Sequence, residues 1–110
     1  MKFRNKKCVP CKDGVLPIAS NELEDYLYGV VGWKLVDDNS AIEKEFKFSN
    51  FKEALKFVNQ VGEIAERENH HPDIEFGWGY CNIRLSTHSI CGLHENDFIV
   101  ASKIDGITDE

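Results

Sequence analysis

The chain has 110 residues, of which 42% are hydrophobic, 11% aromatic and 29% charged, as expected for one globular domain with its own core. The formal net charge is −6, but residues 1–12 carry five basic residues and no acid, which leaves −11 for residues 13–110. Because so acidic a body repels phosphate, we exclude general nucleic-acid binding and interpret the basic start as a solubilising tail.

Neither a membrane span nor a secretory signal is recognisable, because no apolar run is long enough and none follows the basic start. We therefore expect a cytoplasmic protein without membrane contact, with its four cysteines reduced. Cys8 and Cys11 have C-x-x-C spacing, which leaves open half a zinc site, a redox pair or free thiols. Since no second such pair follows, we favour free thiols.

The predicted organisation is an irregular leader with the C-x-x-C pair at residues 1–19 and a single domain at residues 20–110. A first helix is expected to be capped by Asn21, with Glu24 at capping-box spacing, and to end near Gly32. Its apolar stripe consists of Leu23, Tyr26, Leu27, Val30 and Val31.

Two strands are predicted next, at residues 33–36 and 42–48, joined by a turn at residues 37–40. Lys44 is the one residue that breaks the alternation of the second strand. A long helix follows, capped by Asn50 with Glu53 and ending before Pro72. Its apolar side consists of Phe51, Ala54, Leu55, Val58, Val61, Gly62 and Ala65.

Residues 73–78 and 81–86 alternate with opposite parity, which predicts a hairpin with a tight turn. A last helix is expected over residues 95–104. The fold class is therefore α+β, in the order α-β-β-α-β-β-α, with a four-stranded antiparallel sheet and its helices on one face. Such a sheet leaves a face or an edge free for a second subunit.

All four histidines lie within 25 residues, at His70, His71, His88 and His94. Imidazole transfers protons near neutral pH, so histidines from adjoining loops could serve as general acid and base. An adjacent histidine pair is also common at helix ends and surfaces. A zinc site at His70, His71 and His88 is a further alternative, although no zincin spacing occurs.

A longer pattern resembles the pterin-4a-carbinolamine dehydratase family, also known as the dimerisation cofactor family. Seven residue types hold at fixed spacings over 32 positions: Glu66, His70, His71, Pro72, Trp78, His88 and Asp97. Flanking matches extend the resemblance to about residues 20–105. The leader is similar to the N-terminal extension of many microbial members.

The resemblance implies loss of water from 4a-hydroxytetrahydrobiopterin to give quinonoid dihydrobiopterin, with no cofactor and no metal. It implies a homodimer or a dimer of dimers, and a functional link to a phenylalanine hydroxylase that uses the recycled pterin. It also implies that the catalytic residues are His70, His71, His88 and Asp97. The substrate-binding residues are then Glu66, Pro72, Trp78, Ser86 and Thr87.

Within this set, we expect His71 and His88 to transfer protons, His70 to orient the pterin and Asp97 to orient an imidazole. Glu66, one turn before His70, is expected to support it, and Trp78 is either core or a wall against the pterin.

Family members commonly have Thr or Ser where this chain has His94, so we expect a weaker cap there and a surface position for His94. A non-catalytic pterin-binding or protein-assembly role is the alternative function.

Overall fold

The computed structural model describes residues 3–8, 16–87, 90 and 92–108. Its elements are α1 (Ser20–Leu27), β1 (Lys34–Val36), β2 (Ala41–Lys47), α2 (Phe51–Glu68), β3 (Asp73–Gly77), β4 (Tyr80–Leu85) and α3 (Glu95–Thr108). The predicted α+β class and element order are confirmed.

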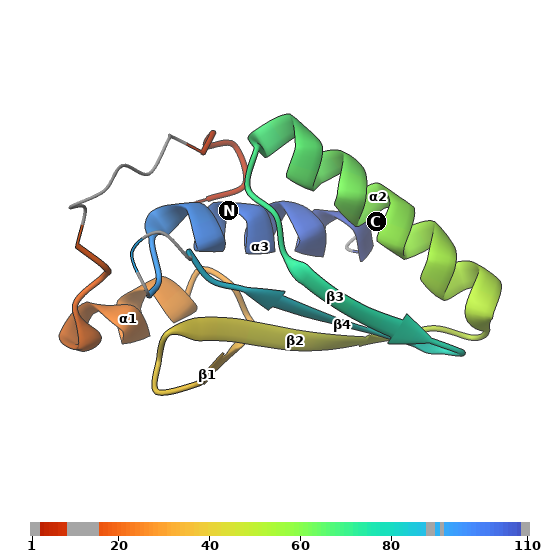
Figure 1. The fold of residues 1–110 in the computed structure, drawn as a ribbon, viewed down its shortest axis with the longest axis horizontal. Helices are drawn as coiled ribbons and strands as arrows, with labels where there is room; N and C mark the ends of the chain where they lie inside the picture. The colour runs from red at the N-terminus through yellow and green to blue at the C-terminus, as the bar shows by residue number, and fades with distance from the viewer. Residues whose placement is uncertain (1–2, 9–15, 88–89, 91, 109–110) are drawn as a thin grey trace.

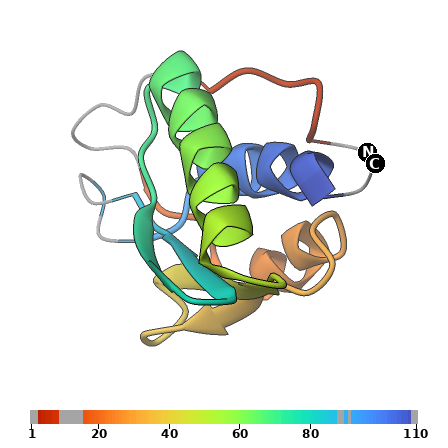
Figure 2. The same cartoon turned by 90° about the vertical axis from the view of Figure 1, so that its right-hand side faces the viewer.

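The four strands form one antiparallel sheet in the order β1-β2-β4-β3. Helices α2 and α3 lie across one face of this sheet, and the other face carries no helix (Figures 1 and 2). The core lies between the two layers and contains alternate residues of the central strands, such as Ile42, Phe46, Cys81 and Ile83. This alternation is what a sheet buried on one side requires.

Helix α3 is the most deeply buried element, because residues 96–102 are all buried. It runs to Thr108, four residues beyond the predicted end. Among the described residues, no helix is both long enough and apolar enough to cross a membrane.

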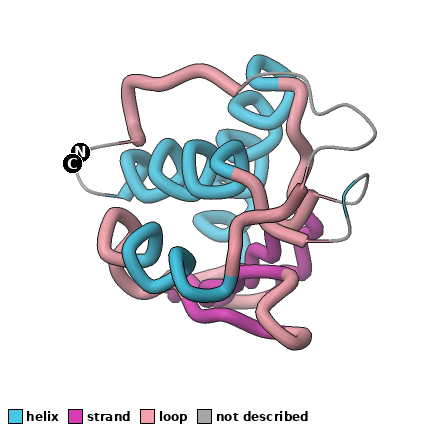
Figure 3. Tube along the Cα trace, turned by 90° about the vertical axis from the view of Figure 1, so that its left-hand side faces the viewer, coloured by secondary structure: helices cyan, strands magenta, loops and turns pink. Residues whose placement is uncertain are grey.

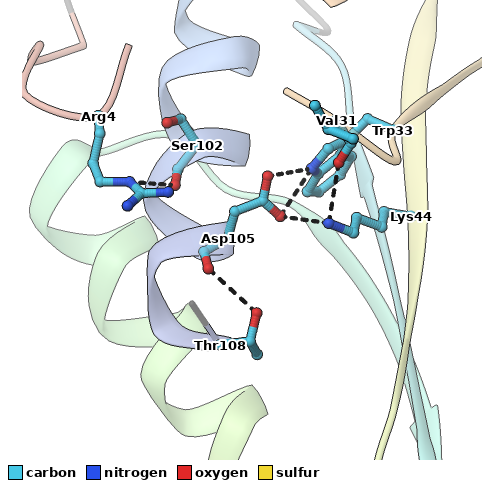
Figure 4. Close-up of polar contacts among 7 residues, drawn as sticks. All are labelled: Arg4, Val31, Trp33, Lys44, Ser102, Asp105 and Thr108. Carbon is cyan, nitrogen blue, oxygen red and sulfur yellow. Dashed lines mark hydrogen bonds and ion pairs between the residues drawn. The ribbon is translucent and has the colours of Figure 1, made fainter. Parts of the chain in front are cut away.

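Lys44 breaks the alternation of β2 because its side chain forms an ion pair with the buried Asp105 (Figure 4). Its Nζ lies 2.9 Å from Asp105 Oδ1 and donates to the Val31 carbonyl oxygen at 3.2 Å. Asp105, on α3, is buried and also accepts from the indole Nε1 of Trp33 at 3.1 Å. The inward lysine therefore neutralises a carboxylate between α3 and the sheet.

Lys44→Met should lower the free energy of unfolding by about 2 kcal/mol, because it leaves the buried Asp105 carboxylate without its cation. Urea unfolding measures this loss. Lys47→Met is the matched control on the same strand, since the Lys47–Glu45 pair is solvent-exposed and contributes little. Equal losses for the two variants would contradict a special role for the Lys44–Asp105 pair.

Helix α2 begins as predicted, because the Asn50 side chain accepts a hydrogen bond from the Glu53 N–H at 2.9 Å. It ends at Glu68, and the left-handed backbone of the C-cap Asn69 (φ 53°) reverses the chain before Pro72 is reached. The predicted buried face was partly wrong. Phe57 and Ile64 are buried, whereas Phe51 and Leu55 are substantially exposed.

Helix α1 starts two residues earlier than predicted and is shorter. Ala19 holds the N-cap position with no side-chain hydrogen bond, and Asn21 lies inside the first turn, so the predicted Asn21 cap was wrong. The helix ends at Leu27, and Val31 is exposed while Val30 is buried. The last two residues of the predicted apolar stripe, Val30 and Val31, therefore lie in the loop after α1, and only Val30 packs into the core.

The β3–β4 hairpin turns through Trp78 and Gly79. Gly79 has φ +83°, a backbone conformation that a residue with a side chain rarely adopts. Trp78 is 71% exposed in this turn, so its alternative placement in the core was wrong.

The leader is part of the fold. Phe3 is fully buried, with its ring centroid 5.8 Å from that of Tyr26 and 6.0 Å from that of Phe98. Gly29 makes room for it, because a Cβ there would lie 2.5 Å from Phe3 Cε2. Interpreting the basic start as a tail was therefore wrong for residues 3–8.

Phe3→Ala should destabilise the protein by about 3 kcal/mol, because it removes a buried aromatic ring and leaves a cavity. Leu16→Ala is the control in the same leader, since Leu16 is exposed and its truncation should cost less than about 0.5 kcal/mol. Thermal and urea unfolding both report the difference. A Phe3→Ala protein as stable as the Leu16→Ala protein would show that the core does not need Phe3.

Candidate active site

The predicted site residues gather mostly at one end of the fold. At this end α2 finishes, β3 starts, β4 finishes and α3 starts (Figure 1). Figure 3 looks onto this end, where loops join the helix layer to the sheet. Loop residues held by such rigid elements are well placed for binding and catalysis.

Asp97 is the centre of this cluster. Its side chain is completely buried in the first turn of α3, and both carboxylate oxygens are engaged. Oδ1 lies 2.6 Å from His70 Nε2, and Oδ2 accepts from the Thr87 hydroxyl at 2.7 Å. Oδ2 also accepts from the His94 backbone N–H at 3.0 Å. A buried carboxylate needs such donors to offset the loss of hydration.

The His94 side chain caps α3, and the residue is half-buried rather than on the surface, while the expected weakness of this cap stays a prediction. Its Nδ1 accepts from the Asn96 backbone N–H at 3.0 Å, while Asp97 accepts from the His94 N–H. This is the reciprocal arrangement of a capping box with an imidazole in place of a hydroxyl. The cap therefore fixes the turn that carries Asp97.

His94→Ala should lower the free energy of unfolding by about 1 kcal/mol, the usual contribution of a helix N-cap. His94→Thr should restore this stability or exceed it, because threonine supplies a side-chain oxygen, which is a preferred helix cap, at the same position. Urea unfolding of the three proteins makes the comparison. Equal stability of the wild-type and alanine proteins would show that the imidazole contributes no cap.

His71 and Glu66 form a second pair beside this cluster. His71 Nε2 lies 2.5 Å from Glu66 Oε2, and the two side chains are 53% and 79% exposed. The sequence pattern placed Glu66 near His70, one helical turn later. Because Asn69 reverses the chain, the carboxylate instead contacts His71.

The two carboxylate contacts set what each ring can do. An ionised carboxylate only accepts, so each contacting Nε2 carries the proton and a neutral ring keeps Nδ1 as its basic nitrogen. The carboxylate also stabilises the ring when it becomes cationic. His70 is held with its side chain 12% exposed, whereas His71 is accessible to a ligand.

The remaining predicted site residues lie in several places. Pro72 and Ser86 flank the cluster next to β3 and β4, and each is partly exposed. Trp78 lies at the far end of β3, whose five residues at about 3.3 Å each separate it from this cluster. Trp78 of the same chain therefore does not line the cluster, and its substrate contact stays a prediction. His88 lies outside the described residues.

Glu68 is a buried acid of this region that the sequence pattern did not single out. Its Oε1 accepts from the Cys8 backbone N–H at 2.9 Å, and its Oε2 lies 3.7 Å from Lys103 Nζ. Burial, together with the charge of Glu68, raises the pKa of the Cys8 thiol to about 12, so this thiol stays protonated. No sequence signal separates Glu68 from the exposed acids of α2.

The metal alternatives gain no support from the described residues. Among them, no group of three histidines, cysteines, aspartates or glutamates is arranged to hold a metal ion. Cys11 and His88 lie outside this set. The hollow on the open face of the sheet is a separate feature, lined by Glu43, Asp73, Ile74, Glu75, Asn82 and Arg84.

The sequence profile of the family Pterin 4 alpha carbinolamine dehydratase matches residues 17–107. The chain belongs to this family. A protein from Rubrobacter xylanophilus is 53% identical over 104 residues, covering 94% of this chain and 96% of the relative. One from Halorhodospira halophila is 50% identical over 107 residues, covering 97% and 98%. Both carry the provisional name pterin-4-alpha-carbinolamine dehydratase.

Solved structures agree with this family assignment. A Brucella melitensis protein described as a transcriptional coactivator/pterin dehydratase is 33% identical, with a TM-score of 0.78. The match covers 83% of this chain and 97% of that protein. A pterin dehydratase-like protein described as a RuBisCO assembly factor of the alpha-carboxysome shares the fold, at 22% identity and a TM-score of 0.63, over 74% and 95% of the two chains.

Proposed function

We propose that this member of the pterin dehydratase family is an active hydro-lyase that removes water from 4a-hydroxytetrahydrobiopterin or a closely related pterin. The observation that carries the proposal is the pair of histidine–carboxylate contacts, His70–Asp97 and His71–Glu66, on adjacent residues of one loop. Membership of the family and the names of the relatives support this reaction class.

The reaction needs proton transfer at two atoms. The N5–H bond of the substrate breaks and its electron pair forms the C4a=N5 double bond. The C4a–O bond breaks, and the hydroxyl leaves as water after taking a proton. Loss of water involves no net oxidation or reduction, so the reaction needs no oxidant or reductant. A general acid and a general base are therefore sufficient.

Among the three histidines that the family resemblance makes catalytic, we assign proton transfer to His71 and His88. The accessible ring of His71, with Nδ1 free when Glu66 holds Nε2, supports this assignment. His70, fixed by the buried Asp97, is suited to bind and orient the pterin. Thr87 supports the site through Asp97.

Decay of freshly generated 4a-carbinolamine should be accelerated by the wild-type protein. His71→Ala and His88→Ala should each slow the catalysed rate by about 10²- to 10⁴-fold, the usual contribution of a general acid or base. Stopped-flow absorbance follows the decay, and Glu63→Ala, an exposed residue of α2, is the control.

A wild-type protein that does not accelerate the decay would contradict the proposal. Pterin binding without turnover would instead favour the alternative role as a non-catalytic pterin-binding or assembly factor. Activity that survives exhaustive chelation would argue against a metal at His70, His71 and His88.

We further propose that the reaction recycles tetrahydrobiopterin for an aromatic amino acid hydroxylase such as phenylalanine hydroxylase. We also propose that the chain works as a homodimer or a dimer of dimers. The helix-free face of the sheet and the edge position of β3 support this second proposal. Light scattering of the purified protein measures the assembly.

A further inference from the structure

The distance between His70 and Asp97 depends on how two helix ends are held together. His70 is the second residue after α2, and its backbone N–H donates to the Ala65 carbonyl oxygen at 3.2 Å. Asp97 lies in the first turn of α3. Any shift of the end of α2 against the start of α3 therefore changes the 2.6 Å contact.

Glu68, the last residue of α2, connects α2 to α3 and to the leader. Its side chain is 6% exposed, and its carboxylate reaches Lys103 on α3 and the backbone of Cys8 in the leader. Lys103 in turn donates to the Arg4 carbonyl oxygen at 2.9 Å. One buried acid thus joins α2, α3 and the leader.

The leader also contacts the start of α3. Lys6 Nζ lies 2.7 Å from Glu95 Oε2, and the Cys8 thiol donates to the Asn96 carbonyl oxygen at 3.7 Å. Glu95 and Asn96 directly precede Asp97. Residues 3–8 therefore touch the end of the helix before His70 and the start of the helix that carries its partner, and the leader passes beside the end of α2 in Figure 1.

We propose that Glu68 is a positioning residue. Together with the leader segment at residues 3–8, it fixes the distance between the His70 ring and the Asp97 carboxylate. It touches neither His70 nor Asp97 in any described contact, so it acts through the backbone of the two helix ends. Catalytic rates are sensitive to such support, since a misplacement of about 1 Å can cost about 100-fold. The kinetic part of this inference rests on the proposed dehydratase activity.

The test compares the full-length variants Glu68→Ala and Glu68→Gln with the control Glu63→Ala from the exposed side of the same helix. Glutamine keeps an oxygen for the Cys8 N–H and removes only the ion pair with Lys103. Proton NMR of the ring N–H reports the short His70–Asp97 hydrogen bond directly, because such a bond moves the signal far downfield. Circular dichroism selects conditions under which all variants are folded.

Glu68→Ala should weaken or shift this downfield signal and lower kcat about 10- to 100-fold, with KM changed less than about threefold. Glu68→Gln should fall between Glu68→Ala and the wild type, and Glu63→Ala should match the wild type. The proposal is overturned if Glu68→Ala keeps both the signal and kcat. If the alanine variant does not fold, an unchanged signal in Glu68→Gln overturns it in the same way.

The NMR measurement needs no substrate, so it distinguishes the two hypotheses. A protein without dehydratase activity whose downfield signal still depends on Glu68 would refute the proposed function and support the positioning role. An active protein whose downfield signal and kcat do not change on substitution of Glu68 would support the proposed function and refute the positioning role.

Discussion

The burial of the Asp97 carboxylate is the constraint on which this end of the molecule depends. A carboxylate removed from water costs several kcal/mol unless donors surround it. Three donors meet it here, from His70, from Thr87 and from the His94 backbone. Each donor is brought to Asp97 by a local feature of the backbone: the left-handed turn at Asn69, the end of β4 and the cap at His94. The geometry of the site therefore depends directly on these three backbone features.

A second buried acid has a corresponding role at the other end of α3. Asp105 is neutralised by Lys44 and bonded by Trp33, so it attaches the last turns of the helix to the sheet and the preceding loop. Apolar packing alone fixes the rotation of a helix poorly when it is buried on most sides, as α3 is. Two directional polar contacts, eight residues apart, fix it well, and the orientation of Asp97 toward His70 follows.

The sequence predicts the architecture well because periodicity and capping are local signals. The Asn50 cap, the hairpin and the element order are all readable from neighbouring residues. What it misses depends on contacts between distant residues. Phe3 is interpreted as part of a tail because its partner Phe98 is 95 positions away. Glu68 cannot be told from the other acids of α2 in the sequence, because only the structure shows that Lys103 lies beside it. Lys44 is visible as an anomaly, but its reason, Asp105, is not.

The buried position of Phe3 has a consequence for how the chain is made. Arg4 donates to the Ser102 carbonyl oxygen across 98 positions, and the Phe3 ring packs against Phe98 of α3. During synthesis, Phe3 and Arg4 therefore lack these partners until α3 has been made. Contacts of such long sequence separation are costly in loop-closure entropy and slow folding. Before α3 has folded, Phe3 is an exposed aromatic residue. The flanking basic residues Lys2 and Arg4 keep this segment hydrated in that state.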